Sequence, residues 1–467
     1  MGFVFYDTET TGTDTSFDQI LQFAAIHTDP DLNELDRFEI RCRLLPGVVA
    51  APGAMQVTGV RVSQLSDQAL PSHYEMMCRI REKLLEWSPS TFLGYNSIEF
   101  DEHLLRHSFF KTLHPPYLTN TNGNTRSDVM RMTQAASLFT ADALEIPVGG
   151  NGKRSYKLEH IAPANGFSHE NAHDALADVE ATIHVCRLIS ERAPEVWSSF
   201  MRFGQKAAVI DYVLSETIFC YSDFYFAKPF SWMATVLGEN PDNNSELYIF
   251  DLEVDPESLM ALSDVQLVRR LDQKPKPVRR LRCNASPMIM PAEDAPDFVG
   301  AKTLGMDELE RRALFLSEHE QLRDRLIQTF HSEREVSEPS PYVEKQLYGG
   351  FSSNADQQLM EVFHQVPWPE RVAIVEQFED LRLRELGFRL IHAEYPGALP
   401  EQIRSEIGSA QAQRLLDGGS GLPWMTLKNA EQELLERIAD STGEQREFYL
   451  EHLAFVKERT ALAETCV

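Results

Sequence analysis

The chain has 467 residues, 43% of them hydrophobic and 25% charged. This composition excludes a fully disordered protein, and the length predicts roughly two to four globular domains. Its 71 acidic and 44 basic residues give a formal net charge of −27, which repels nucleic acids and anionic membranes at long range. A polyanion could therefore be held only by a local basic patch or by bound metal ions.

The sequence carries no sign of export or of a membrane anchor. Its six cysteines form no CxxC pair, so buried reduced thiols are expected. The first residues, MGFVFYD, lack the basic and apolar regions of a signal peptide. No stretch approaches the roughly 18 uninterrupted apolar residues of a membrane span. We expect a cytoplasmic protein with no membrane partner.

The first 190 residues alternate strand-like and helix-like segments, which predicts an α/β domain with helices on the faces of a mixed sheet. Strands are predicted at Phe3–Tyr6, Gln22–Thr28, Phe38–Leu44 and Thr91–Tyr95. Helices are predicted at Tyr74–Trp87, through Leu104 and Phe109, and from near Asn171 to Pro194.

The composition changes after Pro194. Residues 205–290 contain aromatic and β-branched runs broken by Pro, Gly and Asn, which predicts a small, mostly β domain. Its predicted strands are Ile218–Tyr225, Leu247–Leu252 and Val278–Cys283, followed by one helix over Thr303–Phe330. Ser337–Pro341 has the composition of a linker. After Gln346 we predict only helices, with turns at Tyr395–Gly397 and Asp417–Pro423.

Three segments of the first domain carry acidic residues in patterns that suit metal binding. Asp7 and Glu9 follow an apolar strand, and because residues two apart on a strand share a face, both carboxylates project together. Asp101 follows a buried strand and a Gly/Asn turn, in the first turn of a helix. Taken alone, either pattern is also typical of an ordinary turn or helix start.

The third segment is His169–Asp178, sequence HENAHDALAD. Asn171 is a favourable N-cap with Asp174 at N3, and Asp178 lies two turns in, on a stripe of small residues that lets the helix approach the sheet. His173 precedes Asp178 by five residues, near the start of the helix. A lone histidine at such a place is usually a surface residue.

Together, Asp7, Glu9, Asp101, Asp178 and His173 make four acids and one base in one domain. Four carboxylates can hold two divalent ions about 4 Å apart, Mg²⁺ or Mn²⁺, which would activate water and stabilise the leaving oxygen of a phosphodiester. His173, with an ordinary pKa near 6.5, could take the proton from that water.

These residues resemble the DEDD exonuclease superfamily, His-containing branch, and within it the bacterial exonuclease I family. The tyrosine branch would have Tyr at position 174, where this chain has Asp. The resemblance covers nearly the whole chain and is carried by Gln22–Ile26, Pro52–Gly59, Gly94–Asn96, Phe100–Glu102, Asp128–Arg131, Leu158–His160, Ala164–Gly166, Asn171–Asp178, Gln346–Tyr348 and Gly350–Phe351.

The resemblance implies a ribonuclease H-like exonuclease domain (1–193), an SH3-like domain with a returning helix (194–336) and an all-α C-terminal domain (342–467), around a passage for single-stranded DNA. It implies Asp7, Glu9 and Asp178 as metal ligands with Asp101 as the fourth acid, and His173 as the base. It places Glu9, Arg106, Tyr117, Arg131 and Lys157 at substrate contacts. Where the family often has Arg, Lys157 keeps the charge but not the planar bidentate grip.

The implied activity is 3′→5′ degradation of single-stranded DNA to 5′-mononucleotides, in repair or recombination, by a monomer. The acidic tail of single-stranded-DNA-binding protein is an implied partner. Two alternatives remain: a 3′→5′ exoribonuclease of the ribonuclease T type, against which the extra C-terminal length argues, and an inactive single-strand-binding scaffold, which would usually have lost some of these acids.

Two surface features have no settled role from sequence. Arg269–Arg282 is the one basic run, predicted as a loop leading into a strand, and it reads either as a solvated hairpin or as a groove for DNA or an acidic peptide. Tyr221–Phe226 and Phe230–Trp232 could stack on bases, although alternating aromatics in a strand more often pack a core.

Overall fold

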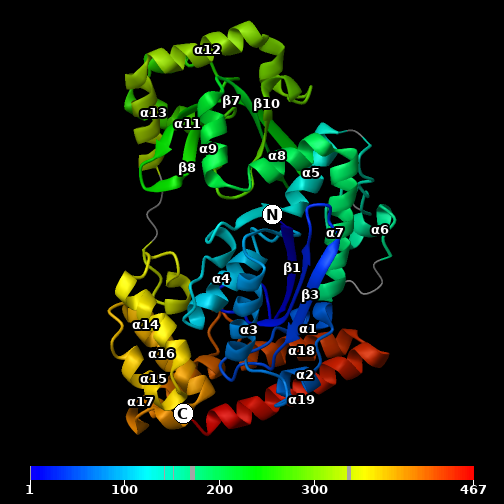
Figure 1. Cartoon of the computed structure of the whole chain (residues 1–467), viewed down its shortest axis with the longest axis vertical. Helices are drawn as coiled ribbons and strands as arrows, with labels where there is room; N and C mark the ends of the chain where they lie inside the picture. The colour runs from blue at the N-terminus through cyan, green and yellow to red at the C-terminus, as the bar shows by residue number, and fades with distance from the viewer. Residues whose placement is uncertain (1, 141, 151, 169–173, 334–337, 467) are drawn as a thin grey trace.

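A computed structural model describes residues 2–140, 142–150, 152–168, 174–333 and 338–466. The chain forms three parts (Figure 1): a central N-terminal part in blue and cyan, a second part in green above it, and a helical part in yellow to red below it. None of the helices in the described ranges is long and apolar enough to cross a membrane.

The N-terminal part is built on a five-stranded mixed sheet. Its strands are β1 (Gly2–Thr10), β2 (Ile20–Thr28), β3 (Glu34–Arg41), β4 (Ser90–Gly94) and β5 (Thr125–Asp128). They lie in the order β3-β2-β1-β4-β5. β2 is antiparallel to both of its neighbours, whereas β1, β4 and β5 run parallel, so the last three strands end at one edge.

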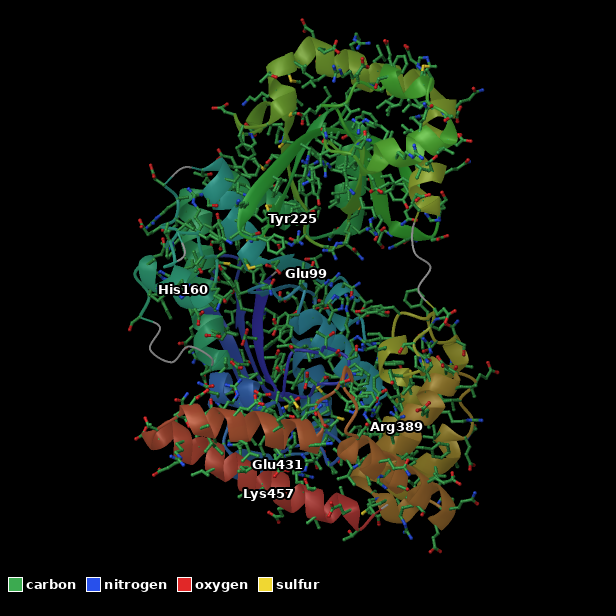
Figure 2. All side chains as sticks on the ribbon, turned by 180° about the vertical axis from the view of Figure 1, so that it is seen from behind. Glu99, His160, Tyr225, Arg389, Glu431 and Lys457 are labelled. Carbon is green, nitrogen blue, oxygen red and sulfur yellow. The ribbon has the colours of Figure 1, made fainter. Side chains whose placement is uncertain are left out.

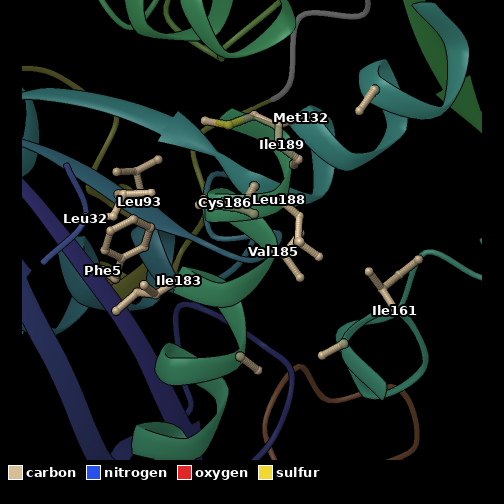
Figure 3. Packing of buried hydrophobic residues seen from close by; sticks show 14 of the residues in the cluster. Phe5, Leu32, Leu93, Met132, Ile161, Ile183, Val185, Cys186, Leu188 and Ile189 are labelled. Atoms are coloured by element: carbon tan, nitrogen blue, oxygen red, sulfur yellow. The ribbon is translucent and has the colours of Figure 1, made fainter. Parts of the chain in front are cut away.

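Helices cover both faces of this sheet. They are α1 (Pro52–Thr58), α2 (Val62–Ser66), α3 (His73–Glu86), α4 (Asp101–Lys111), α5 (Val129–Phe139), α6 (Leu158–Ala164), α7 (Ala175–Arg192) and α8 (Pro194–Arg202), with a 3₁₀ turn at Leu118–Asn120. Val4 and Tyr6 pack on the side of α3 and α4. Phe3 and Phe5 pack on the side of α5, α7 and α8, where Figure 3 shows Phe5 beside Ile183 of α7.

The predicted α/β pattern of this part is confirmed, although β5 and the helices α1, α2, α5, α6 and α8 were not predicted and other details differ. β1 runs on to Thr10, so Asp7 and Glu9 lie inside the strand rather than beyond it. β3 begins at Glu34, not Phe38, because this edge strand alternates charged residues that give little apolar signal. The predicted position of Asp174 at N3 is wrong: Asp174 has extended backbone (φ −107°, ψ 122°) and caps α7, its carboxylate accepting the Ala177 N–H at 3.4 Å, while Asn171 lies outside the described residues.

The second part contains a five-stranded antiparallel sheet in the order β10-β6-β7-β8-β9. Its strands are β6 (Phe219–Tyr225), β7 (Lys228–Asn240), β8 (Asn243–Asp251), β9 (Val278–Arg282) and β10 (Met288–Pro291). Its helices are α9 (Lys206–Ser215), α10 (Glu257–Met260), α11 (Asp264–Asp272), α12 (Met306–Glu318) and α13 (Glu320–Ser332), with 3₁₀ turns at Ala292–Asp294 and Gly300–Leu304. The helices α11 to α13 cover one face of the sheet and α9 covers the other.

The sequence prediction was incomplete for this part. It missed β7, whose bulges at Val236–Gly238 and Glu239–Asn240 interrupt the alternation of side chains, and it missed α9 and α11. The single helix over Thr303–Phe330 is wrong, because the backbone leaves the helical region at His319 (φ −112°, ψ 69°) and separates α12 from α13. The basic run is not one loop, since Arg269 and Arg270 form the last turn of α11.

The helices predicted after Gln346 are confirmed. They are α14 (Asn354–Gln365), α15 (Trp368–Val375), α16 (Leu381–Glu394), α17 (Glu401–Leu416), α18 (Leu427–Asp440) and α19 (Gly443–Glu464), with 3₁₀ turns at Val343–Gln346 and Pro396–Ala398.

The last two helices lie against the N-terminal part (Figure 1). Arg437 of α18 donates a hydrogen bond to Gln56 of α1 at 2.9 Å, and the Tyr449 hydroxyl of α19 donates to the same amide oxygen. Arg459 donates to the Val48 carbonyl at 2.7 Å. The end of the chain thus covers a segment near its beginning.

Candidate active site

The two acids of β1 share one face of the central sheet. Side chains alternate along the strand, so Asp7 and Glu9 lie on the same side as Phe5, toward α7. The antiparallel pairing fixes this register, with Asp7 opposite Ala24 and Glu9 opposite Gln22 on β2. The first half of β1 is apolar and buried in the core, and both carboxylates follow it toward the carboxyl end of the strand.

Helix α7 brings the third acid to the same place. Because Asp174 caps the helix, Asp178 falls in its first turn rather than two turns in. The buried small residues Ala175 and Ala181 allow α7 to pack closely on the sheet, as the sequence predicts. One carboxylate oxygen each of Asp7, Glu9 and Asp178 lies within 4.8 Å of the others. The predicted convergence of acids distant in sequence is thus present in the structure.

Asp101 approaches this edge from the other side of the sheet. It is buried in the first turn of α4, and its Oδ1 accepts a 2.6 Å hydrogen bond from the hydroxyl of Thr8, which lies on the opposite face of β1 from Asp7 and Glu9. It is therefore outside the group of three acids whose oxygens lie within 4.8 Å of one another. Asp101 nevertheless repels Asp7 and Glu9 and raises the pKa of both.

The electrostatics of the cluster call for a positive charge. Burial raises the pKa of Asp7 well above its ordinary value, and repulsion from Asp101, Asp178 and Glu9 adds to the rise. Burial followed by repulsion from Asp178 raises the pKa of Glu9 to about 9. Burial raises the pKa of Asp101 to about 7. A hard divalent cation with oxygen ligands would offset this repulsion, so the residues present fit such an ion.

His173, the predicted base, lies outside the described residues, as do His169 and Asn171. The described neighbour Asp174 is held by Gln22, which donates to its carboxylate at 3.1 Å, and by Arg41 at 2.7 Å. These bonds fix the start of α7, the element that carries Asp178, against the edge of the sheet.

The four predicted DNA-contacting residues beyond the cluster do not form one group. Arg106 and Tyr117 lie together, with the guanidinium carbon 5.1 Å from the ring centroid. Arg131 pairs with Glu99 at 3.3 Å. The side chain of Lys157 is 72% exposed and pairs with Glu159 at 2.9 Å, at the start of α6.

Sequence reasoning did not single out Glu102 as a functional residue. Its buried carboxylate accepts hydrogen bonds from Arg106 Nε at 2.7 Å, from Thr119 at 2.5 Å and from the Tyr6 hydroxyl at 3.0 Å. Arg126 Nη1 lies 3.0 Å away. Burial opposes ionisation, but Arg106 and Arg126 hold the pKa of Glu102 at about 2. The i,i+4 spacing of Glu102 and Arg106 was the available signal.

A second group of potential ligands lies between the N-terminal part and α14. Cys78, His114 and His364 have ligand atoms within 4.8 Å of one another. However, both ring nitrogens of His364 already have partners, the Tyr74 hydroxyl and the Leu113 carbonyl, each at 2.9 Å. The two imidazole rings stack at 3.8 Å between centroids. This group forms a packed interface rather than a second metal centre.

Two family models match parts of this chain. Residues 4–186 match the exonuclease family, and residues 341–457 match the exonuclease I C-terminal domain. Exodeoxyribonuclease I of Escherichia coli K12 is 30% identical over 418 residues, covering 85% of this chain and 86% of that protein. The chain belongs to the exodeoxyribonuclease I family. The Haemophilus influenzae member is 30% identical over 409 residues, covering 83% of this chain and 85% of that protein.

Solved structures of exonuclease I share the whole fold. The enzyme of Methylocaldum szegediense superposes with a TM-score of 0.83 at 26% identity, covering 98% of this chain and 99% of that one. E. coli exonuclease I in complex with a dA16 oligonucleotide gives 0.82 at 26% identity, covering 100% of both chains. The predicted nuclease, its ribonuclease H-like exonuclease domain and its helical C-terminal domain are thus confirmed. The family uses divalent metal ions, which the acid cluster fits.

Proposed function

We propose that this exodeoxyribonuclease I family member degrades single-stranded DNA from the 3′ end to 5′-mononucleotides, using two bound Mg²⁺ or Mn²⁺ ions. The observation that carries the proposal is the convergence of Asp7, Glu9 and Asp178 within 4.8 Å at the end of β1. The solved complex of E. coli exonuclease I with a dA16 oligonucleotide supports a single-stranded substrate.

Each acid has a distinct part in this proposal. Asp7, Glu9 and Asp178 would hold the ions, and Asp101, fixed by Thr8, would complete the set as the fourth acid. When bound, such ions supply a nucleophilic hydroxide and stabilise the departing oxygen. The chain's own contribution is to hold four carboxyl groups close together on β1, α4 and α7, elements whose packing fixes their positions.

His173 is the proposed general base. Its imidazole would accept the proton of the attacking water, since an ordinary histidine pKa near 6.5 leaves the ring largely neutral and able to accept at neutral pH. The spacing of five residues between His173 and Asp178 supports this role.

Substrate contacts are proposed for Glu9, Arg106, Tyr117, Arg131 and Lys157. Arg106 and Tyr117 pack against each other, with the buried Arg106 paired to Glu102 and the ring of Tyr117 partly exposed. Arg131 lies beside the loop that leads into α4, through its pair with Glu99. Lys157 is exposed enough to reach a phosphate, although as a point charge rather than as a bidentate donor.

Further parts of the proposal rest on family membership. They are a three-domain division at 1–193, 194–336 and 342–467 with an SH3-like second domain, a monomeric state, cytoplasmic action in repair or recombination, and binding of the acidic tail of single-stranded-DNA-binding protein. Arg279, Arg280 and Arg282 of β9 supply positive charge for that tail or for DNA. Neutralising the three should weaken tail binding or flatten the salt dependence of DNA binding; no change in either would exclude the role.

The proposal is tested by digesting oligonucleotides labelled at the 3′ or the 5′ end, with Mg²⁺ and with EDTA. Rapid release of 3′ label from single-stranded DNA, abolished by EDTA and by Asp7→Asn or Asp178→Asn, is expected. Asp264→Asn, which alters a surface pair with Arg325, is the matched control. Preference for a matched RNA strand, or equal activity of the Asp7 variant, would refute the proposal.

A further inference from the structure

Glu99 bridges the two sheets of the molecule next to the acid cluster. It lies between β4 and α4, two residues before Asp101. Its Oε1 accepts from Nη2 of Arg282 on β9 at 2.5 Å and from Nη2 of Arg131 on α5 at 3.3 Å. One carboxylate thus holds two guanidinium groups, one from each part of the chain.

Arg131 and Arg282 present their guanidinium groups at this junction, where Arg131 also interacts with the carboxylates of Asp128 and Asp223. Arg131 is mostly buried and therefore fixed in direction, whereas Arg282 and Glu99 are about half exposed and open to solvent. The Glu99 carboxylate and its pair with Arg282 are therefore within reach of solvent and of a competing anion.

Exposed aromatic side chains lie on the β6–β7 hairpin near this site. Figure 2 labels Tyr225, at the end of β6, close to Glu99 at the junction, and Arg131 interacts with both. Tyr225 packs edge-on against Phe230 at 5.5 Å, and Phe226 at the hairpin tip is 92% exposed. The predicted aromatic runs therefore serve two different places: Tyr221 and Trp232 are buried in the core, whereas the aromatic residues at the end of the hairpin are exposed. Cations beside exposed rings suit a single strand of nucleic acid.

We propose that Arg131 and Arg282 form a binding site for a phosphate of single-stranded DNA, and that the Glu99 carboxylate occupies it until the strand displaces it. The inference rests on the proposed function. A phosphate offers the same anionic oxygens to the two guanidinium groups that Glu99 offers now. Binding must break the Glu99 pairs and leave its charge near the strand, so Glu99 weakens the grip on DNA and favours release of the strand between steps.

The test is the variant Glu99→Gln, which keeps the side-chain shape and removes the charge. Binding of a fluorescent single-stranded oligonucleotide is measured by anisotropy in EDTA, so that no cleavage occurs, over a range of salt. We expect roughly tenfold tighter binding at low salt, because a negative charge a few ångströms from the phosphate is gone. We also expect a salt slope steeper by about 0.7 for each phosphate contact strengthened.

Glu385→Gln is the matched control. Glu385 pairs with Arg389 at 2.5 Å with similar exposure of both side chains, on the helical part labelled by Arg389 in Figure 2. It should bind DNA like the wild type. Arg282→Gln should weaken binding, and adding it to Glu99→Gln should remove most of the gain. Thermal unfolding of each variant verifies its fold.

The outcomes separate this inference from the proposed function. If the wild type binds single-stranded DNA but Glu99→Gln binds with equal or lower affinity, the phosphate site is refuted and Glu99 only ties the two sheets together. If the wild type binds no single-stranded DNA at all, the proposed function itself is refuted, and with it the inference that rests on it. A gain in Glu99→Gln that persists unchanged in the Arg282 double variant also refutes the site.

Discussion

Replacing Glu9 by Gln should stabilise the protein when no metal is bound. In the folded chain the pKa of Glu9 rises from 4.5 to about 9, chiefly through burial and repulsion from Asp178. At pH 7 the folded state must therefore hold a proton that the unfolded chain has released. The difference of 2.5 pH units between 7 and 4.5, at 1.36 kcal/mol per unit, costs about 3 kcal/mol of folding free energy.

The sign of the pH dependence follows from the raised pKa. The wild type in EDTA has its full stability below pH 4.5 and loses it as the pH rises toward 9. The Gln variant lacks this titration, so its free energy of unfolding should exceed that of the wild type by up to about 3 kcal/mol at pH 7 and differ little at pH 4.5. With Mg²⁺ the order should reverse, because only the wild type retains the full ligand set.

Urea unfolding followed by circular dichroism, between pH 4.5 and 9 and with EDTA or Mg²⁺, measures these differences. Glu385→Gln, at a distant surface pair, should track the wild type under every condition. The reasoning would be refuted if Glu9→Gln were less stable than the wild type in EDTA at pH 7. A stability difference that does not change with pH would refute it equally.

Three further changes test other parts of the molecule. Glu102→Ala leaves Arg106 and Arg126 buried without their carboxylate and should lower the free energy of unfolding by about 3–5 kcal/mol in urea at pH 7; a loss below about 1 kcal/mol would contradict this. Burial lowers the pKa of His364 to about 4, so stability should fall by up to about 3 kcal/mol as the pH drops from 6.5 to 4, and His364→Gln should flatten that decline in a urea series. His173→Ala should slow single-turnover cleavage by about 10²–10⁴-fold while calorimetry still detects metal binding. A normal rate would refute the assignment of His173 as the general base.

The sequence was sufficient to predict the acid cluster because the strand and helix that carry it follow local rules. Phe5, Asp7 and Glu9 share a face by simple alternation, and the small residues of α7 mark the side that packs closely. The exact start of α7 was not predictable in this way, since Asn171 and Asp174 are both good capping residues and only tertiary contacts with Gln22 and Arg41 favour the second.

Features that depend on contacts between distant parts of the chain could not be predicted from the sequence. Glu99 and Arg282 are 183 positions apart, and no local sequence pattern around either residue indicates that the two pair. The break at His319 was hidden because α12 and α13 each continue an amphipathic pattern across it. Local periodicity predicts which face is buried but does not report where one helix ends and the next begins.

The packing of α18 and α19 on α1 has a consequence for how the protein is made. The apolar residues Val49 and Met55 near the chain's beginning belong to clusters that Leu434 and Phe448, from its last two helices, help to complete. During translation these early residues stay exposed to solvent until some 400 further residues have been synthesised. A chain that ends before the final helix is therefore expected to expose an apolar surface, the kind of surface that chaperones and proteases recognise.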